Sequence, residues 1–241
     1  MTVAAHPRYR VKKAKTDSDM AAAQALRSLC FKLSKRTDAD AFDVKCIHLL
    51  IEDRTTKELL CCFRAMPLVG AEIAQSYSAQ FYDLSRLAAF DGPMLELGRF
   101  CIAPHCKDPD VLRLAWATLT RYVDTQAVRI LFGCSSFDGT DTTAYLDAFA
   151  LLKARHLAPA HWMPQVKAPD VIRFSTPFRS RPDLKEAMRV MPPLLRSYLV
   201  MGGWVSDHAV VDRDMNTLHV FTGVEVAAIP AARQRSLRAI T

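Results

Sequence analysis

Residues 94–137 decide the fold, and they begin with an extended apolar run, Met94-Leu-Glu-Leu-Gly-Arg-Phe-Cys-Ile-Ala103. Apolar residues then recur at three- and four-residue spacing over residues 111–124, after a turn rich in Pro and Asp. A second apolar run, Val128-Arg-Ile-Leu-Phe132, leads into the small residues Gly133-Cys-Ser-Ser-Phe137. A strand, a helix and a strand within about forty residues predict a parallel, right-handed βαβ crossover.

Two charged residues, Glu96 and Arg99, interrupt the first of these strands. Charged side chains in a buried strand are costly, and a fold retains them where they are paired or used. Strict alternation would place the two on opposite faces, whereas a β-bulge at Gly98 would turn both to the same side. We therefore expect a bulge there. We favour Glu96 as a base and Arg99 as an anion binder over the alternative, a structural ion pair.

Length and composition favour one large domain. The chain has 241 residues and 50% hydrophobic content, enough to bury a sizeable core. We expect a single domain over residues 1–241, with a basic arm at 1–16 and a Pro-rich basic insertion at 156–193. No apolar run approaches the roughly 18 residues of a membrane span, and the first residues lack the apolar segment of a secretory signal. Seven cysteines without regular spacing favour reduced thiols in a cytoplasmic protein.

The net charge of +7 is concentrated in two regions. Residues 1–36 hold nine Lys or Arg against two Asp, and residues 153–196 hold nine basic against three acidic residues. Such regions favour an anionic partner, either nucleic acid, an acidic protein or an anionic membrane, although solvated surface lysines are an equally good explanation. No Gly-rich phosphate loop or G-x-G-x-x-G is present, which argues against nucleotide-binding folds of those types.

The remaining segments are expected to add a hairpin and further helices. Asp108 and Pro109 suit the start of the helix in the central stretch. The other expected elements are a short strand at 9–11, a helix capped by Asp17 or Ser18 and running to about residue 33, strands at 45–52 and 58–66, helices at 142–155, 184–190 and 193–201, a polar loop at 206–214, and a strand at 218–226.

Further charged and small residues offer chemistry. Arg27, Asp40, Asp43 and Arg64 lie near apolar segments, and either a substrate site or an internal ion-pair network explains them. Gly133-Cys-Ser-Ser-Phe137 is expected at the carboxyl end of a parallel strand, where such folds bind ligands, with Tyr145 nearby as an acid or a core residue. The cysteines and histidines show no metal-ligand spacing, so we expect no metal. Ser206-Asp207-His208 holds the residue types of a hydrolase triad, but three neighbours in sequence can hardly form one.

Taken in order, these residues resemble the ornithine lipid N-acyltransferases. The likeness is carried by motifs spread over most of the chain: Leu26-Arg-x-x-x-Phe31, Asp40-x-Phe42-Asp43, Cys46-x-His48, Arg64, Glu96-Leu-Gly-Arg99, Phe132-Gly-Cys-Ser-Ser-Phe137, Pro192-Pro-Leu-Leu-Arg-Ser-Tyr198, Gly203-Trp-Val-x-Asp207 and Ala209-Val-Val-Asp-Arg213. A more distant likeness is to the acyl-homoserine lactone synthases. Both groups belong to the GNAT acyltransferase superfamily.

The resemblance implies a mixed α/β fold with a splayed sheet flanked by helices, and transfer of a 3-hydroxyacyl chain from acyl carrier protein to the α-amine of ornithine. It implies no cofactor beyond that thioester, and peripheral contact with an anionic membrane rather than nucleic acid. Glu96 would take the amine proton, assisted by Arg99 and by backbone N–H groups at the bulge. The residues expected to bind substrate are Arg27, Asp43, Arg64, Cys134, Ser135, Ser136, Tyr145, Asp207 and Asp212.

Three alternatives stay open at this point. The acceptor could be glutamine instead of ornithine. The chain could also be an acyl-homoserine lactone synthase, or a basic module without catalysis that binds membrane or nucleic acid. Between strand and helix it carries Pro104-His-Cys-Lys-Asp-Pro109 where GNAT enzymes have a Gly-rich pyrophosphate loop. This difference favours a carrier-protein donor over free coenzyme A.

Overall fold

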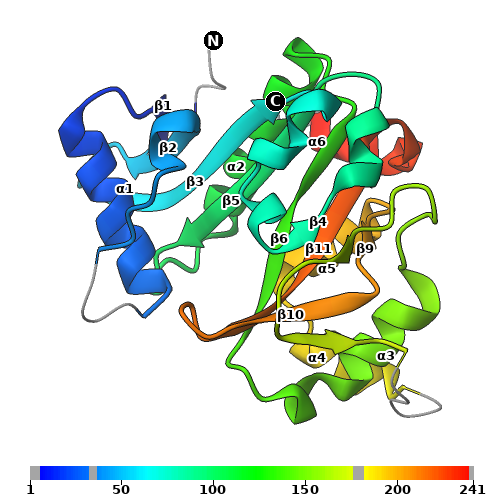
Figure 1. The fold of residues 1–241 in the computed structure, drawn as a ribbon. Helices are drawn as coiled ribbons and strands as arrows, with labels where there is room; N and C mark the ends of the chain where they lie inside the picture. Colours follow the sequence, from blue (N-terminus) through cyan, green and yellow to red (C-terminus); the bar gives the residue numbers. More distant parts are fainter. Residues whose placement is uncertain (1–5, 33–36, 176–181, 239–241) are drawn as a thin grey trace. The chain divides into compact units, whose positions relative to one another are not determined.

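The computed structural model describes residues 6–32, 37–175 and 182–238, and the chain forms two compact units (Figure 1). Unit 1 comprises Met1–Pro67, Leu97–Val128 and Ala231–Thr241. Unit 2 comprises Leu68–Glu96 and Arg129–Pro230. Strand β5 (Met94–Ile102) passes from unit 2 into unit 1, and the boundary falls between the two charged residues that interrupt it.

Unit 1 is a sheet with the strand order β1 (Tyr9–Lys13), β2 (Ile47–Asp53), β3 (Leu59–Leu68) and the second part of β5. The pairs β1–β2 and β2–β3 are antiparallel, so the expected hairpin is confirmed. The helices of this unit are α1 (Asp17–Cys30), the short η1 (Asp43–Lys45), α2 (Pro109–Thr125) and α6 (Ala231–Arg238).

Helices α1 and α2 cover opposite faces of this sheet. Neighbouring residues of a strand point to opposite faces, and on β3 the Cys62 thiol donates to the Ala23 carbonyl of α1. Phe63 instead stacks on Phe100, with ring centroids 5.1 Å apart, and Phe100 lies against Trp116 of α2.

The helix starts follow ordinary capping chemistry. Asp108 caps α2 and Pro109 occupies its first turn, as predicted. For α1 the prediction of Asp17 or Ser18 as cap is wrong. The cap is Thr16, whose hydroxyl accepts from the Asp19 amide while the Asp19 carboxylate accepts from the Thr16 amide.

Unit 2 continues from the first part of β5 in the order β6 (Ile130–Asp138), β11 (Thr217–Glu225), β10 (His208–Asp212) and β8 (Val171–Arg173). β5 and β6 are parallel, which confirms the pairing expected of the crossover, whereas the other pairs are antiparallel. β9 (Trp204–Val205) adds to β11, and β4 (Tyr82–Asp83) pairs with β7 (Gln165–Val166).

Helices and 3-10 turns complete unit 2. The helices are α3 (Leu146–Arg155), α4 (Leu184–Val190) and α5 (Pro193–Val200), and the turns are η2 (Gly70–Gln75), η3 (Ser78–Gln80), η4 (Ser85–Ala89), η5 (Thr142–Tyr145) and η6 (Val226–Ala228). One face of β6, β11 and β10 is buried against α3, α4 and α5 through Phe137, Phe149, Leu195 and Val220.

Three expectations for unit 2 are wrong. Gly133–Phe137 lies inside β6 instead of following it, because β11 pairs with β6 along nine consecutive positions. The expected loop at 206–214 contains β10, since its backbone pairs with β11 and β8. The segment at 156–193 is not only irregular, because it supplies β7 and β8. Strand pairing across the sheet outweighs local propensity in all three cases.

Within the described ranges 6–32, 37–175 and 182–238, none of the helices is both long and apolar enough to cross a bilayer.

Candidate active site

Glu96 in unit 2 is buried and held by three donors. The amide of Tyr77 donates to Oε2 at 2.7 Å, and the amide and hydroxyl of Ser78 donate to Oε1 at 2.7 and 2.6 Å. Because all three groups donate, the site fits a carboxylate, which only accepts. Ser78 Oγ also lies 3.5 Å from the Cys134 thiol on β6. The carboxylate is therefore fixed between η3 and the sheet.

The strand register shows which residues share a sheet face with Glu96. Glu96 lies opposite Phe132 on β6, and alternation along β6 puts Cys134 and Ser136 on that same face. On β11 their partners are Phe221 and His219. Ser135 points to the other face, where it accepts a hydrogen bond from Thr222 at 3.0 Å.

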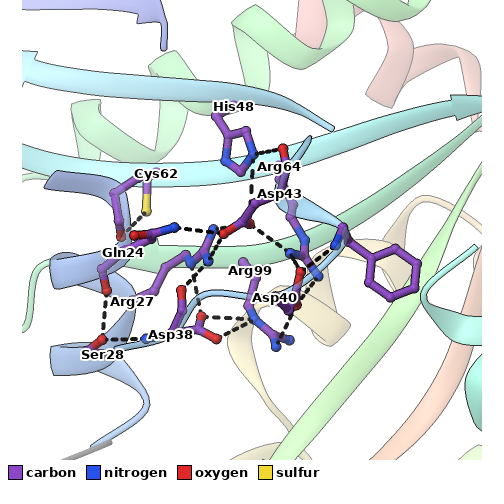
Figure 2. Close-up of polar contacts among 12 residues, drawn as sticks. Gln24, Arg27, Ser28, Asp38, Asp40, Asp43, His48, Cys62, Arg64 and Arg99 are labelled. Atoms are coloured by element: carbon purple, nitrogen blue, oxygen red, sulfur yellow. Dashed lines mark hydrogen bonds and ion pairs between the residues drawn. The ribbon is translucent and has the colours of Figure 1, made fainter. Parts of the chain in front are cut away.

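Arg99 in unit 1 has a left-handed backbone, with φ of 52°. β5 is thus irregular where a bulge was expected, but the unusual conformation lies at Arg99 and not at Gly98. The guanidinium donates to Asp38 at 2.9 Å and to Asp40 at 3.3 Å (Figure 2). It also lies over the Phe31 ring. Arg99 is therefore paired with two carboxylates of unit 1.

Arg27 and Arg64 extend this cluster (Figure 2). Arg27, 1% exposed, donates to Asp43 at 2.8 and 2.9 Å and to Asp38 at 2.9 Å. Arg64 donates to Asp40 at 2.6 Å and to Asp43 at 3.0 Å. Three guanidinium groups thus meet three carboxylates, and their formal charges cancel. Mutual pairing makes such a buried set tolerable.

The cluster shifts the ionisation of its acids. Burial alone would raise the pKa of Asp43, but hydrogen bonds from Arg27 and Gln24 and the charges of Arg27 and Arg64 outweigh it and hold that pKa far below its ordinary value. For the same reasons, with Arg64 as its partner, the pKa of Asp40 is lowered. Burial lowers the pKa of His48, whose Nε2 lies 2.9 Å from the Asp43 carbonyl. The network is therefore built to remain ionised.

The structure brings five of the predicted residues together, since Arg27, Asp40, Asp43, Arg64 and Arg99 form one network. The predicted residues Cys134 and Ser136 share a sheet face with Glu96. The other predicted residues have separate contacts: Ser135 bonds Thr222, Tyr145 donates to the Asp138 carbonyl, Asp207 pairs with His208 Nδ1 at 2.7 Å, and Asp212 accepts from the Met215 amide at 3.0 Å in the β10–β11 turn.

Sequence patterns missed several participants. Tyr77 and Ser78 hold Glu96 largely through backbone amides, which no side-chain pattern reveals. Asp38 was missed because it precedes the motif that was recognised, Asp40-x-Phe42-Asp43. His219 and Tyr82 were missed as well, and only their pairing across unit 2 makes them notable.

The start of α2 in unit 1 is closed to an anion. Pro109 has no N–H, and the Asp110 amide donates to the Asp108 carboxylate at 2.9 Å. That carboxylate also accepts from the Tyr9 hydroxyl at 2.5 Å and from Arg8 at 3.2 Å. Burial and the bond to Asp108 raise the pKa of Tyr9 to about 12. The anion-binding capacity of a helix N-terminus is therefore used by the protein's own Asp108.

Across the part of the chain that the structure describes, no group of three or more His, Cys, Asp or Glu side chains is placed to hold a metal ion.

A mixed sheet flanked by helices, in which β5 and β6 run parallel, is the architecture of a GNAT-type acyltransferase. Residues 27–117 match the family model described as an acetyltransferase (GNAT) domain. The solved structure of FeeM, an N-acyl amino acid synthase from uncultured soil microbes, superposes with a TM-score of 0.53. It covers 98% of this chain and 99% of its own at 11% identity, which supports the fold.

The chain belongs to the L-ornithine N(alpha)-acyltransferase family. The relative of that name from Rhodobacter capsulatus is 32% identical over 238 residues, which cover 92% of this chain and 91% of the relative. The relative from Brucella abortus is 30% identical over 196 residues, covering 78% of this chain and 69% of the relative.

Proposed function

We propose that this protein transfers a 3-hydroxyacyl chain from acyl carrier protein to the α-amine of ornithine, giving a lyso-ornithine lipid. The observation that carries this proposal is family membership over 92% of the chain. The fixed carboxylate of Glu96 supplies a chemical rationale for transfer to an amine.

Glu96 acts as the general base in this proposal. Only the free-base form of an amine attacks a thioester, so a group must take its proton, directly or through water. The nitrogen then bonds to the thioester carbon, and the carrier thiolate leaves once the tetrahedral intermediate collapses. Ser78 and the Tyr77 amide keep the carboxylate in one position, which suits a base that must meet its proton within hydrogen-bond distance. Backbone N–H groups at the irregular part of β5 are our candidates for the oxyanion.

The network of Arg27, Asp38, Asp40, Asp43, Arg64 and Arg99 fixes α1, β3 and β5 in unit 1. Within this network the Arg99 guanidinium is held by Asp38 and Asp40. The half-exposed Asp207 is the candidate for the cationic end of ornithine.

A carrier-protein donor fits the start of α2 better than coenzyme A does. The pyrophosphate of coenzyme A needs free N–H groups at a helix start, whereas Asp108 and Asp110 place negative charge there and Pro109 removes a donor. Carrier proteins are acidic, and the net charge of +7 would attract them. Because the product is an amphiphile, we also expect peripheral contact with an anionic membrane.

The test is lipid mass spectrometry of a bacterial host that lacks ornithine lipids and expresses this chain. N-acyl ornithine with a 3-hydroxyacyl chain is the expected product, and the Glu96→Gln variant should not form it. N-acyl glutamine instead would correct the acceptor. An unchanged lipid profile, with the protein present and folded, would contradict the proposal.

A further inference from the structure

Unit 2 contains two histidines whose ring nitrogens are unusually placed. His208 is 0% exposed and His219 is 3% exposed. In the described part of the chain, Nε2 of each ring has no hydrogen-bond partner. Buried polar atoms are nearly always paired, so two such atoms in one cluster call for an explanation.

The other nitrogen of each ring fixes what Nε2 can do. The Tyr82 hydroxyl donates its single hydrogen to the His219 carbonyl at 2.9 Å, so it accepts from Nδ1–H of His219 at 3.1 Å. Burial, and then the charge of His208, lower the pKa of His219 to about 4, so its ring is neutral near pH 7. With hydrogen on Nδ1, its Nε2 carries a lone pair and accepts.

His208 has the same arrangement. Its Nδ1 lies 2.7 Å from the Asp207 carboxylate, whose pKa is lowered by that bond, so Nδ1 is the donor. Nε2 of this ring is left with one polar partner to find. Nε2 of His219 therefore requires a hydrogen-bond donor, and Nε2 of His208 requires one further polar group.

The surroundings restrict the donor. The Tyr82 ring lies 5.2 Å from the His208 ring and 5.6 Å from the His219 ring, between centroids. Phe81 lies edge-on to His219 at 4.9 Å, and Phe221 contacts Tyr82 at 5.7 Å. The Asp207 carboxylate is already bonded to Nδ1 of His208, so an ammonium group entering this aromatic site would lose its hydration and have to share that carboxylate, which is costly. A hydroxyl group on an alkyl chain fits this site, because the aromatic rings pack against the alkyl chain and a histidine nitrogen accepts the hydroxyl hydrogen.

The site lies on the sheet face that carries Glu96. His219 is opposite Ser136, and alternation along β10 from Val210, the partner of His219, puts His208 on the same face. Strand spacing and rise place both histidines roughly 16 Å from Glu96 between Cα atoms. Side chains on one face can lean toward one another, so their functional atoms can be several ångströms closer than their Cα atoms. The reacting amine, the thioester carbon and the hydroxyl group two carbons along the acyl chain form one continuous span. Together with one hydrogen bond at each end, it measures roughly 10 Å.

We propose that His208 and His219 bind the hydroxyl group of the 3-hydroxyacyl chain and so select hydroxylated donors. This inference rests on the proposed function. Nε2 of His219 takes the hydroxyl hydrogen, and Nε2 of His208 pairs with the hydroxyl oxygen directly or through a water. An acyl donor without the hydroxyl group leaves the histidine nitrogens without a partner. Binding sites with buried polar groups reject a substrate that lacks the matching group most strongly.

The experiment compares 3-hydroxyacyl and unsubstituted acyl carrier protein of equal chain length in the wild type, His208→Phe and His219→Phe. Phenylalanine keeps the aromatic volume and removes Nε2. The ratio of kcat/KM for the two donors should fall about ten- to a hundredfold in at least one variant. Because both donors are measured on one preparation, the ratio does not depend on the folded fraction.

Thr222→Val is the matched control, since it removes a buried hydroxyl bond on the opposite face of β11. It should leave the donor ratio unchanged. An unchanged ratio in both histidine variants would overturn the inference and assign the nitrogens to an ordered water.

A second measurement separates this inference from the proposed function. Binding of free 3-hydroxymyristic acid and myristic acid, followed by calorimetry, needs neither ornithine nor a carrier protein. The hydroxy acid should bind more tightly to the wild type, and this preference should be lost in the histidine variants. Equal binding of both acids to the wild type would contradict the inference even if ornithine is acylated.

Discussion

Oε1 of Glu96 accepts two hydrogen bonds from one residue, the amide and the hydroxyl of Ser78, at 2.7 and 2.6 Å. A carboxylate held in this way loses most of its freedom to rotate. The base is therefore positioned by a 3-10 turn of unit 2. This relationship gives Ser78 a positioning role that can be separated from the chemistry of Glu96.

Replacing Ser78 by Ala should remove one donor and leave both amides in place. A hydrogen bond to a charged group contributes about 1.5–3 kcal/mol, so we expect the free energy of unfolding of the variant to fall by about that amount. We expect its kcat to fall roughly tenfold. Its pH–rate profile should keep the wild-type shape, since the carboxylate is still present. Thermal unfolding and kcat measured on the same sample check this, and a changed profile would mean that Ser78 takes part in proton transfer.

The network of unit 1 makes stability depend on acid. The pKa of Asp43 is lowered in the folded protein from an ordinary value of 3.8, so its stabilising contribution is present above that value and is lost as pH falls below it. Asp40 acts in the same direction. The free energy of unfolding should thus decrease below about pH 4.

Asp43→Asn removes one of these charges and leaves Arg27 with a weaker partner. It should be less stable than the wild type at neutral pH, with a smaller decrease in acid. Denaturant unfolding at several pH values measures both. Parallel stability curves for variant and wild type would show that Asp43 does not contribute to the acid response.

Attraction of an acidic carrier protein should depend on salt, because surface charges are screened over about 8 Å at physiological ionic strength. Among the basic residues of 156–193, Lys185 is exposed on α4, whereas Arg179 and Arg181 lie outside the described residues. Lys185→Glu should raise KM for the carrier-protein donor severalfold and leave kcat unchanged. Lys57→Glu, in the β2–β3 turn of unit 1, is a control of equal charge change. Turnover that does not respond to salt would reject electrostatic docking.

The sequence predicted the elements with strong periodicity and failed where partners come from elsewhere in the chain. The helical spacing around Trp116 and the apolar runs of β5 and β6 were sufficient for the parallel unit. β10 was missed because its first residue is His208, a polar residue that becomes buried only by pairing with Asp207 and packing on Tyr82. Local pattern contains no information on such contacts.

The same limit applies to the candidate site. Glu96 and Arg99 were recognised because charge in an apolar strand is unusual. Their partners were not, since Glu96 is held by backbone amides and Arg99 by Asp38, eleven residues beyond Arg27 in the chain. A bulge was placed at Gly98 because strict alternation puts Glu96 and Arg99 on opposite faces, whereas the left-handed residue of β5 is Arg99, whose guanidinium is bonded to Asp38 and Asp40.

The Glu96→Gln variant tests the central claim, that Glu96 takes the amine proton. The amide of Gln can accept from Ser78, but its NH2 group then faces the Tyr77 amide, two donors that repel each other. Some loss of stability is therefore expected along with the loss of base. Melting temperature must be measured with activity, and Ser78→Ala, which disturbs the same bonds but keeps the carboxylate, is the matched control.

The decisive measurement is the pH–rate profile of Glu96→Gln, as kcat/KM for ornithine per folded molecule. A positioned base contributes about a hundred- to ten-thousandfold, or roughly 3–5 kcal/mol of barrier. We predict a loss of that size near pH 7 and partial recovery as rising pH supplies free amine, with no such recovery in Ser78→Ala. A variant that turns over ornithine near the wild-type rate at neutral pH would contradict the account.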